Sequence, residues 1–175
     1  MVPLRDNNPT SRTAFVTYGI ILVNVLVFVY ELSLGPDLEA FFRVWAVVPA
    51  TLTASFSGAA TGLPFPAWVT LVTSQFLHGG FLHIGGNMLF LWIFGNNVED
   101  RLGHLRFLIF YLGCGVLAGL TQWFFSAYST VPSLGASGAI AGVMGAYILR
   151  FPQAKVLTLV PLGFFITAFQ IPAIF

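Results

Sequence analysis

Charged side chains are absent from long parts of this chain, which has no Asp, Glu, Lys or Arg from Val44 to Val98 or from Phe107 to Leu149. Overall, 57% of the 175 residues are apolar and 7% are charged. Soluble domains have about 45 to 50% apolar and about 25% charged residues. A soluble fold cannot cover its surface with so few charges, so the sequence predicts an integral membrane protein embedded in a lipid bilayer.

Three stretches have the length and composition of membrane-spanning helices. The first, Thr13–Tyr30, carries no charge. At about 1.5 Å rise per residue it crosses most of a hydrocarbon core about 30 Å thick, so that Glu31 is expected to reach the far membrane interface. We expect a second span from about Phe81 to Val98 and a third from Phe107 to Ala127.

The segment between the first two spans, residues 36–77, cannot form one helix. It is interrupted by Pro49, Pro64 and Pro66, and proline removes a helical hydrogen bond. We expect an irregular segment at the outer membrane interface, anchored by aromatic side chains. The expected anchors are Phe41, Phe42, Trp45 and Trp68.

The apolar stretch from Gly138 to Leu149 is too short to cross a bilayer, because it makes only about 18 Å of helix. It contributes a fourth span only if it begins inside the membrane, reached through the uncharged loop Ser126–Leu134. Irregular backbone at that depth must be buried in protein or line a watery cavity. We therefore expect a functional site where this short helix begins.

The last residues, Val156–Phe175, are apolar but interrupted by Pro161, Gly163 and Pro172. They form either a fifth span or a short hairpin that leads to a span barely begun. The lack of a polar flank at the end favours the hairpin. The expected fold is thus an all-α, polytopic helical bundle with four spans and a partial fifth.

Basic residues predict the orientation, because cytoplasmic loops carry an excess of Lys and Arg. With the N-terminus inside, all of the 7 basic residues except Arg43 lie on the cytoplasmic side. We expect residues 1–12 to be a cytoplasmic tail and residues 13–175 to be one multi-pass domain in a plasma membrane of bacterial type.

Several functions are excluded by what the chain lacks. A net charge of +1 without any basic run does not provide the electrostatic footprint of a nucleic-acid binder. His78 and His83 are not in a His-Glu-x-x-His arrangement, so we expect no metal site, and no organic cofactor is implied. The single cysteine, Cys114, lies in an apolar run and is interpreted as a small packing residue.

Ser137 is the first candidate for chemistry, because it stands in the sequence Gly-Ala-Ser-Gly where the short helix is expected to begin. Backbone N–H groups at a helix start have no intrahelical partner, and together with the helix dipole they favour a developing negative charge. This is what an oxyanion hole beside a nucleophile requires. The alternative is structural: Gly138, Gly142 and Gly145 form a small-residue face for tight helix packing.

His83 and Asn87 are the second candidates, since a spacing of four places both on one face of the second span. An ionisable ring inside a membrane helix indicates a functional site, and an Asn amide can donate to an oxyanion. The alternative is that both side chains make interhelical hydrogen bonds worth about 0.6 to 2 kcal/mol.

Together these motifs resemble the rhomboid family of intramembrane serine proteases. His83–Asn87 matches the family's H-x-x-x-N and Gly135–Gly138 matches its G-x-S-G, in the expected order. The flanking residues Thr73–His78, Gly95 with Glu99, Arg101 and Gly103, and Val23–Val25 are also similar.

The resemblance implies a rhomboid-like fold and an endopeptidase that cleaves transmembrane protein substrates. Ser137 would be the nucleophile, and His83, Asn87 and the Ser137 N–H would hold the oxyanion. Glu99 and Arg101 would be structural.

The sequence departs from the family pattern in two ways. Val69 and Thr70 stand where the family usually has Trp-Arg, and no histidine follows His104, although the family's general base is a histidine on a sixth span. His78 is expected near the outer face and His104 on the cytoplasmic side, so neither suits Ser137. We therefore expect a C-terminally truncated and nearly inactive chain, because a serine without a base is a poor nucleophile.

Two rival functions remain. The first is a non-catalytic rhomboid-like protein that binds client transmembrane helices through the same cavity. The second, a small channel or transporter, is the weakest interpretation, because the polar residues gather toward one side and not along a path through the membrane.

Overall fold

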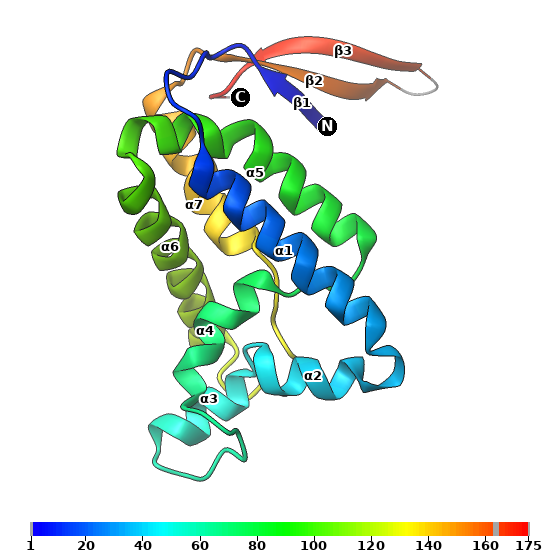
Figure 1. Ribbon diagram of the computed structural model, residues 1–175, viewed down its shortest axis with the longest axis vertical. Coiled ribbons are helices and arrows are strands. Elements are labelled where there is room, and N and C mark those ends of the chain that lie inside the picture. Colours follow the sequence, from blue (N-terminus) through cyan, green and yellow to red (C-terminus); the bar gives the residue numbers. More distant parts are fainter. Residues whose placement is uncertain (1, 163–164, 175) are drawn as a thin grey trace.

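The apolar stretches fold into helices that run side by side along the longest axis of the molecule (Figure 1). The computed structural model describes residues 2–162 and 165–174. The three predicted long helices and the predicted short one are present. They are α1 (Phe15–Ser33), α5 (Phe81–Leu102), α6 (His104–Phe125) and the shorter α7 (Ser137–Arg150), which packs against α5 and α6.

The number of membrane crossings agrees only in part with the prediction. Among the residues that the structure describes, α1 and α6 are long and apolar enough to cross a membrane. A third crossing is counted if Ala67–Phe76 and α5, which meet at an angle of 83°, form one bent span. Helix α7 has 14 residues and therefore reaches about 21 Å, less than the hydrocarbon thickness of about 30 Å.

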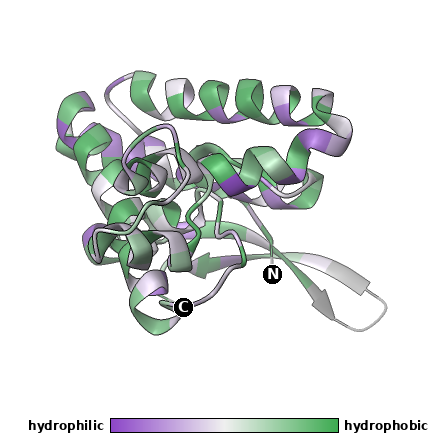
Figure 2. Cartoon of the chain, turned by 90° about the horizontal axis from the view of Figure 1, so that it is seen from below, coloured by the Kyte–Doolittle hydropathy of each residue, from purple (hydrophilic) through white to green (hydrophobic). Residues whose placement is uncertain are grey.

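The outer faces of α1 and α6 carry large apolar side chains, as expected of helices that face lipid. Figure 2 shows hydrophobic residues along the helices, with hydrophilic residues scattered among them. The exposed side chains include Leu22, Leu26, Val29, Leu105, Leu117, Phe124 and Phe125.

The segment between α1 and α5 is broken into short helices, which lie at the end of the bundle shown lowest in Figure 1. The prediction that it is not one helix is confirmed, but the segment is more regular than expected. Proline begins one of these helices, a position where its missing N–H costs nothing. The elements are η1 (Gly35–Asp37), α2 (Leu38–Trp45), α3 (Pro49–Phe56), η2 (Ala67–Val69), α4 (Thr70–Thr73) and η3 (Ser74–Phe76).

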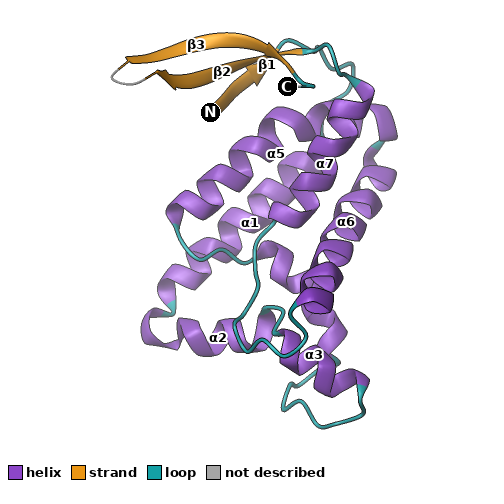
Figure 3. Ribbon diagram, turned by 180° about the vertical axis from the view of Figure 1, so that it is seen from behind, coloured by secondary structure: helices purple, strands orange, loops and turns teal. Residues whose placement is uncertain are grey.

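A small antiparallel sheet at the opposite end corrects the all-α prediction (Figure 3). Its strands, in the order β1-β2-β3, are β1 (Val2–Asp6), β2 (Lys155–Leu162) and β3 (Phe165–Pro172). In β2 the β-branched residues Val156, Thr158 and Val160 are buried and alternate with more exposed leucines, which is the period of a strand and not of a helix. Strands therefore replace the expected partial fifth span, and part of the predicted tail, Val2–Asp6, is an edge strand.

The first strand is attached to the helices by a buried polar contact. The Asp6 carboxylate accepts hydrogen bonds from Asn97 of α5 at 2.8 Å and from the Tyr147 hydroxyl of α7 at 2.7 Å. Burial raises the pKa of the Asp6 carboxyl above its ordinary value, while these hydrogen bonds act in the opposite direction. These hydrogen bonds fix the N-terminal segment to the ends of α5 and α7 that the sequence predicts to be cytoplasmic.

The start of α1 is fixed by Glu99 of α5. Its carboxylate accepts hydrogen bonds from the N–H groups of Val16 and Thr17, at 2.9 and 2.7 Å, and from the Thr17 hydroxyl at 2.6 Å. A carboxylate at a helix N-terminus satisfies orphan donors and complements the helix dipole. Glu99 therefore has the structural role that the sequence suggested.

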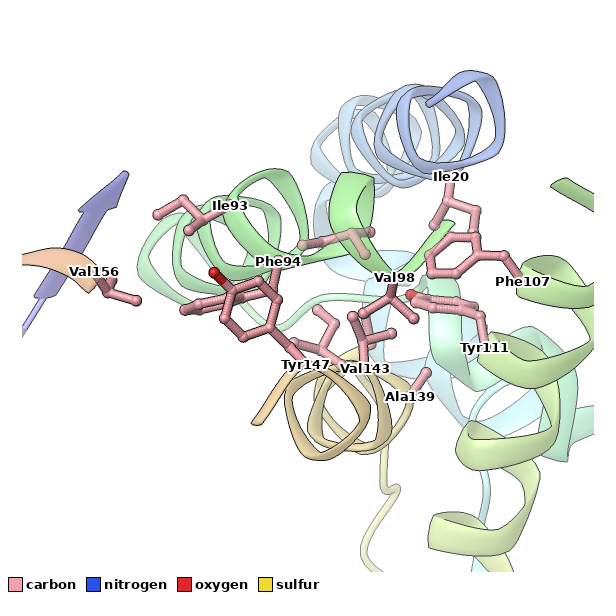
Figure 4. Close-up of a cluster of buried hydrophobic side chains, with 13 residues drawn as sticks. Ile20, Ile93, Phe94, Val98, Phe107, Tyr111, Ala139, Val143, Tyr147 and Val156 are labelled. Atoms are coloured by element: carbon pink, nitrogen blue, oxygen red, sulfur yellow. The ribbon is translucent and has the colours of Figure 1, made fainter. Parts of the chain in front are cut away.

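The main core lies where α1, α5, α6 and α7 converge, as Figure 4 shows. Ile20 comes from α1, Phe94 from α5 and Tyr111 from α6, and the rings of Phe94 and Tyr147 meet edge to face with centroids 4.9 Å apart. Helix α7 approaches α6 closely at Gly138 and Gly142, where an added Cβ would collide with Ala118 and Cys114. The predicted small-residue face is thus a real packing surface, and Gly145 lies outside it.

We expect Gly142→Ala to lower the free energy of unfolding by about 1 to 3 kcal/mol, because overpacking forces α6 and α7 apart. Gly145→Ala is the matched control: nothing lies within 4 Å of its new methyl group. It should be neutral or stabilising by up to about 1 kcal/mol, since Ala favours a helix. Unfolding in mixed detergent micelles measures both variants, and equal stabilities would contradict the packing described.

Candidate active site

Ser137 is the first residue of α7 and follows a glycine turn that leads the preceding loop into the helix. Gly135 has a φ of +122°, which side chains disfavour, and its N–H donates to the Ser74 carbonyl at 2.8 Å. In the described structure no side chain caps the first turn of α7. The N–H groups of that turn are therefore available to an anion, and the helix dipole adds a partial positive charge.

The loop before α7 is irregular, yet backbone hydrogen bonds hold it against the protein. Ser133 exchanges two of them with Val47, at 3.0 and 2.7 Å, and the Ala50 N–H donates to the Ser129 carbonyl at 3.0 Å. Figure 1 shows this loop, in yellow, rising from the end that holds α2 and α3 into the bundle. This loop leads directly into α7, and the side chain of Ser137, its first residue, is exposed.

His83, in the first turn of α5, points its ring at the turn before Ser137. A Cβ placed on Gly135 would lie 2.7 Å from the His83 Nε2 and 3.8 Å from the Ser137 Oγ. The other ring nitrogen, Nδ1, accepts a hydrogen bond from the Gly79 N–H at 3.4 Å. Only glycine at position 135 allows the imidazole to approach this closely.

Asn87 lies one turn after His83 on the same face of α5. One hydrogen of its amide is donated to the His83 carbonyl at 3.0 Å, so the second hydrogen remains for another acceptor. His83, Asn87 and Ser137 all line one cavity of about 360 Å³ between α5 and α7. The structure therefore brings together the three residues that the sequence selected.

Comparison with protein families classifies the chain. The family model of the Rhomboid domain matches residues 66–175, a range that contains His83, Asn87 and Ser137. The chain belongs to the rhomboid family. As a rhomboid with long apolar helices, it is a membrane protein.

Rhomboid relatives from three organisms are similar to this chain. Rhomboid-like protein 11, chloroplastic, of Arabidopsis thaliana is 30% identical over 93% of the chain and 52% of its own length. Rhomboid protein 1, mitochondrial, of Saccharomyces cerevisiae is 36% identical over 53% of the chain and 28% of its own length. Rhomboid protease GluP of Bacillus subtilis is 43% identical over 46% of the chain and 15% of its own length. The chain thus spans about half of the first relative and less than a third of the other two.

A second cavity of about 180 Å³ lies beside the rhomboid serine and was not predicted from the sequence. It is lined by Ser137 together with polar side chains from several elements. Those side chains are Ser74, Gln75, Gln122 and Ser133. The sequence signal for this cavity was a pair of glutamines, Gln75 and Gln122, inside charge-free apolar stretches. The two glutamines lie far apart in the sequence, and no sequence pattern shows that they meet.

In the described structure, neither His78 nor His104 hydrogen-bonds to the rhomboid serine. His78 is 1% exposed and neither ring nitrogen has a hydrogen-bond partner in the described structure. His104 contacts Glu99 at the far end of α5. Within residues 2–162 and 165–174, no side chain makes a hydrogen bond to the Ser137 hydroxyl, and no group of three or more metal-ligating side chains is found.

Proposed function

We propose that this chain carries the nucleophile and the oxyanion site of an intramembrane serine endopeptidase that cleaves transmembrane protein substrates. The observation that supports this proposal best is the single cavity lined by Ser137, His83 and Asn87. A hydroxyl, an imidazole nitrogen and an amide converge there beside a helix start with free N–H groups. Acyl transfer requires this combination of a nucleophile and donors around a developing negative charge.

In the proposed reaction, the Ser137 Oγ attacks the carbonyl carbon of a peptide bond and its proton passes to a general base. The carbonyl oxygen becomes an oxyanion, to which the Ser137 N–H, the His83 Nε2 and the free Asn87 amide hydrogen donate. The base then protonates the leaving amine, and water hydrolyses the acyl-enzyme. In the part of the chain that the structure describes, no histidine hydrogen-bonds to the Ser137 hydroxyl, so the proposal leaves the general base unassigned.

Substrate access is proposed from the lipid side. The cavity opens between α5 and α7, and the neighbouring Leu82 side chain is 94% exposed. A substrate helix can approach there only after its backbone unwinds, because a peptide carbonyl within a helix is already hydrogen-bonded.

A second candidate is a non-catalytic protein that binds client transmembrane helices in the same cavity. The observation that favours this candidate is that no described side chain accepts a hydrogen bond from the Ser137 hydroxyl, as a general base would. For this candidate Ser137→Ala leaves function unchanged, whereas the endopeptidase loses it.

A fluorophosphonate distinguishes the two candidates, because it reacts with activated serines. The probe is applied to the protein in its native membranes, and the peptide carrying Ser137 is identified by mass spectrometry. We expect labelling of Ser137 there and little labelling of the isolated 175-residue chain. Unlabelled Ser137 in native membranes would support the client binder, and strong labelling of the isolated chain would contradict the missing base.

We also propose that the N-terminus lies in the cytoplasm, in a plasma membrane of bacterial type. Names of two relatives refer to organelles, so the family is not confined to that membrane. A cysteine at Ser129, in a chain with Cys114→Ala, is expected to react with an impermeant thiol reagent added outside. A cysteine at Arg106 should react only after lysis. The reverse pattern would overturn the orientation.

A further inference from the structure

A buried carboxylate that takes no part in the proposed reaction lies behind His83. Glu31 is near the end of α1 and is 1% exposed. The sequence suggested that it reaches the membrane interface, and the structure adds that its side chain is buried within the protein. Both carboxylate oxygens lie near the backbone N–H of His78, at 3.2 and 3.3 Å. Among the described residues, no other donor to this carboxylate is found.

The bond from His78 fixes the short loop between η3 and α5. Its next residue, Gly79, donates its N–H to the Nδ1 of His83 at 3.4 Å. The ring of His78 packs edge to face on the ring of His83, with centroids 5.1 Å apart. Glu31 therefore reaches the His83 imidazole through two consecutive backbone N–H groups and one ring contact.

The Gly79 bond has a chemical consequence for His83. A neutral imidazole has one N–H and one acceptor nitrogen, and the bond that one nitrogen makes selects the tautomer. Because Nδ1 accepts from Gly79, the proton belongs on Nε2. That nitrogen is the one beside Gly135 and the Ser137 turn.

We propose that Glu31 is a positioning residue, which holds the loop Leu77–Gly80 so that Gly79 fixes His83 as an Nε2–H donor. This inference rests on the proposed function for its catalytic meaning, since it names what prepares one oxyanion donor. Glu31 does not touch the reacting atoms. Its role requires a hydrogen-bond acceptor, which glutamine also provides and alanine does not.

The direct test is nitrogen NMR of the imidazole rings in the full chain, with ¹⁵N-labelled histidine. Protonated and unprotonated ring nitrogens resonate far apart, and three histidines are assigned by replacing His78 and His104 in turn. We expect the neutral His83 ring to carry its proton on Nε2. A proton on Nδ1 would overturn the proposal without any variant of Glu31.

The variants E31Q and E31A test the part played by the carboxylate. E31Q should keep the Nε2–H tautomer, whereas E31A should give a mixture of tautomers. E31D, which shortens the side chain while keeping its carboxyl group, should give a smaller change and serves if E31A does not fold. The matched control is Asn24→Ala, which removes another buried polar side chain of α1 whose hydrogen bond stays within its own helix. A parent-like tautomer in both E31A and E31D would overturn the role of Glu31.

In an active form, E31A should lower kcat about ten- to a hundredfold with little change in KM, less than loss of the donor itself. E31Q should restore kcat. A normal kcat in E31A, together with the altered tautomer, would count against His83 as an oxyanion donor and hence against the proposed function. An unaltered tautomer counts against the positioning role alone, so the two failures are distinguishable.

Discussion

Ser137→Ala is expected to remove peptide-bond cleavage almost completely, by about 10⁵-fold or more, because the nucleophile of a serine peptidase has no substitute. The fold should persist: Ser137 makes no side-chain cap, and Ala is the best helix former. The measurement is the rate of cleavage of a model transmembrane substrate by the protein in its native membranes, followed by gel and mass spectrometry.

Ser133→Ala is the matched control for this experiment. Ser133 lies in the same loop and lines the polar cavity beside Ser137, but its hydrogen bonds to Val47 use only the backbone. We expect the cleavage rate of Ser133→Ala to stay within about threefold of the parent rate, because the loss of one minor contact has an effect of this size. If Ser137→Ala keeps a similar rate, Ser137 is not the nucleophile. If the parent protein also shows no cleavage, the client binder becomes the better explanation.

Asn87→Ala is expected to lower turnover about ten- to a thousandfold, by analogy with the loss of one oxyanion donor. KM should change little, because the amide is proposed to donate only to the oxyanion. Asn87→Asp keeps the shape of the side chain but loses the donor, so it should be similarly slow. Steady-state rates over a range of substrate concentrations in detergent or lipid separate kcat from KM.

The control for Asn87 is Asn96→Ala, a change of the same chemistry on the same helix. Asn96 lies toward the other end of α5 and accepts a hydrogen bond from the N–H of Asn97. Its replacement should alter stability slightly and kcat hardly at all. Equal kcat values for Asn87→Ala and the parent would remove Asn87 from the site.

The parts of the fold that follow from local sequence could be predicted. Charge-free stretches of sufficient length gave α1 and α6, and the short apolar stretch before Arg150 gave α7 with Ser137 at its start. The four-residue spacing of His83 and Asn87 placed both on one face of α5 because the period of a helix is known in advance. These predictions needed only the neighbours of each residue along the chain.

The parts that depend on distant pairing could not be predicted. Val2 pairs with Leu159 and Asp6 with Val156, and no local pattern in residues 2–6 announces a partner so far along the chain. From the sequence alone, Glu31 stands at the end of a span near the interface. Its burial becomes visible only when α1 is packed beside the His78 loop. The polar cavity beside Ser137 is likewise assembled from separate elements.

The pairing of β1 with β2 sets an order of events during synthesis. The ribosome makes Val2–Asp6 first and Lys155–Leu162 about 150 residues later, which at roughly 5 to 20 residues per second is a delay of roughly 8 to 30 s. Throughout that interval the first strand has no strand to pair with, and its Asp6 must also wait for Tyr147. The N-terminal segment is therefore free to meet the insertion machinery or chaperones early, and the sheet closes only after β2 has been made.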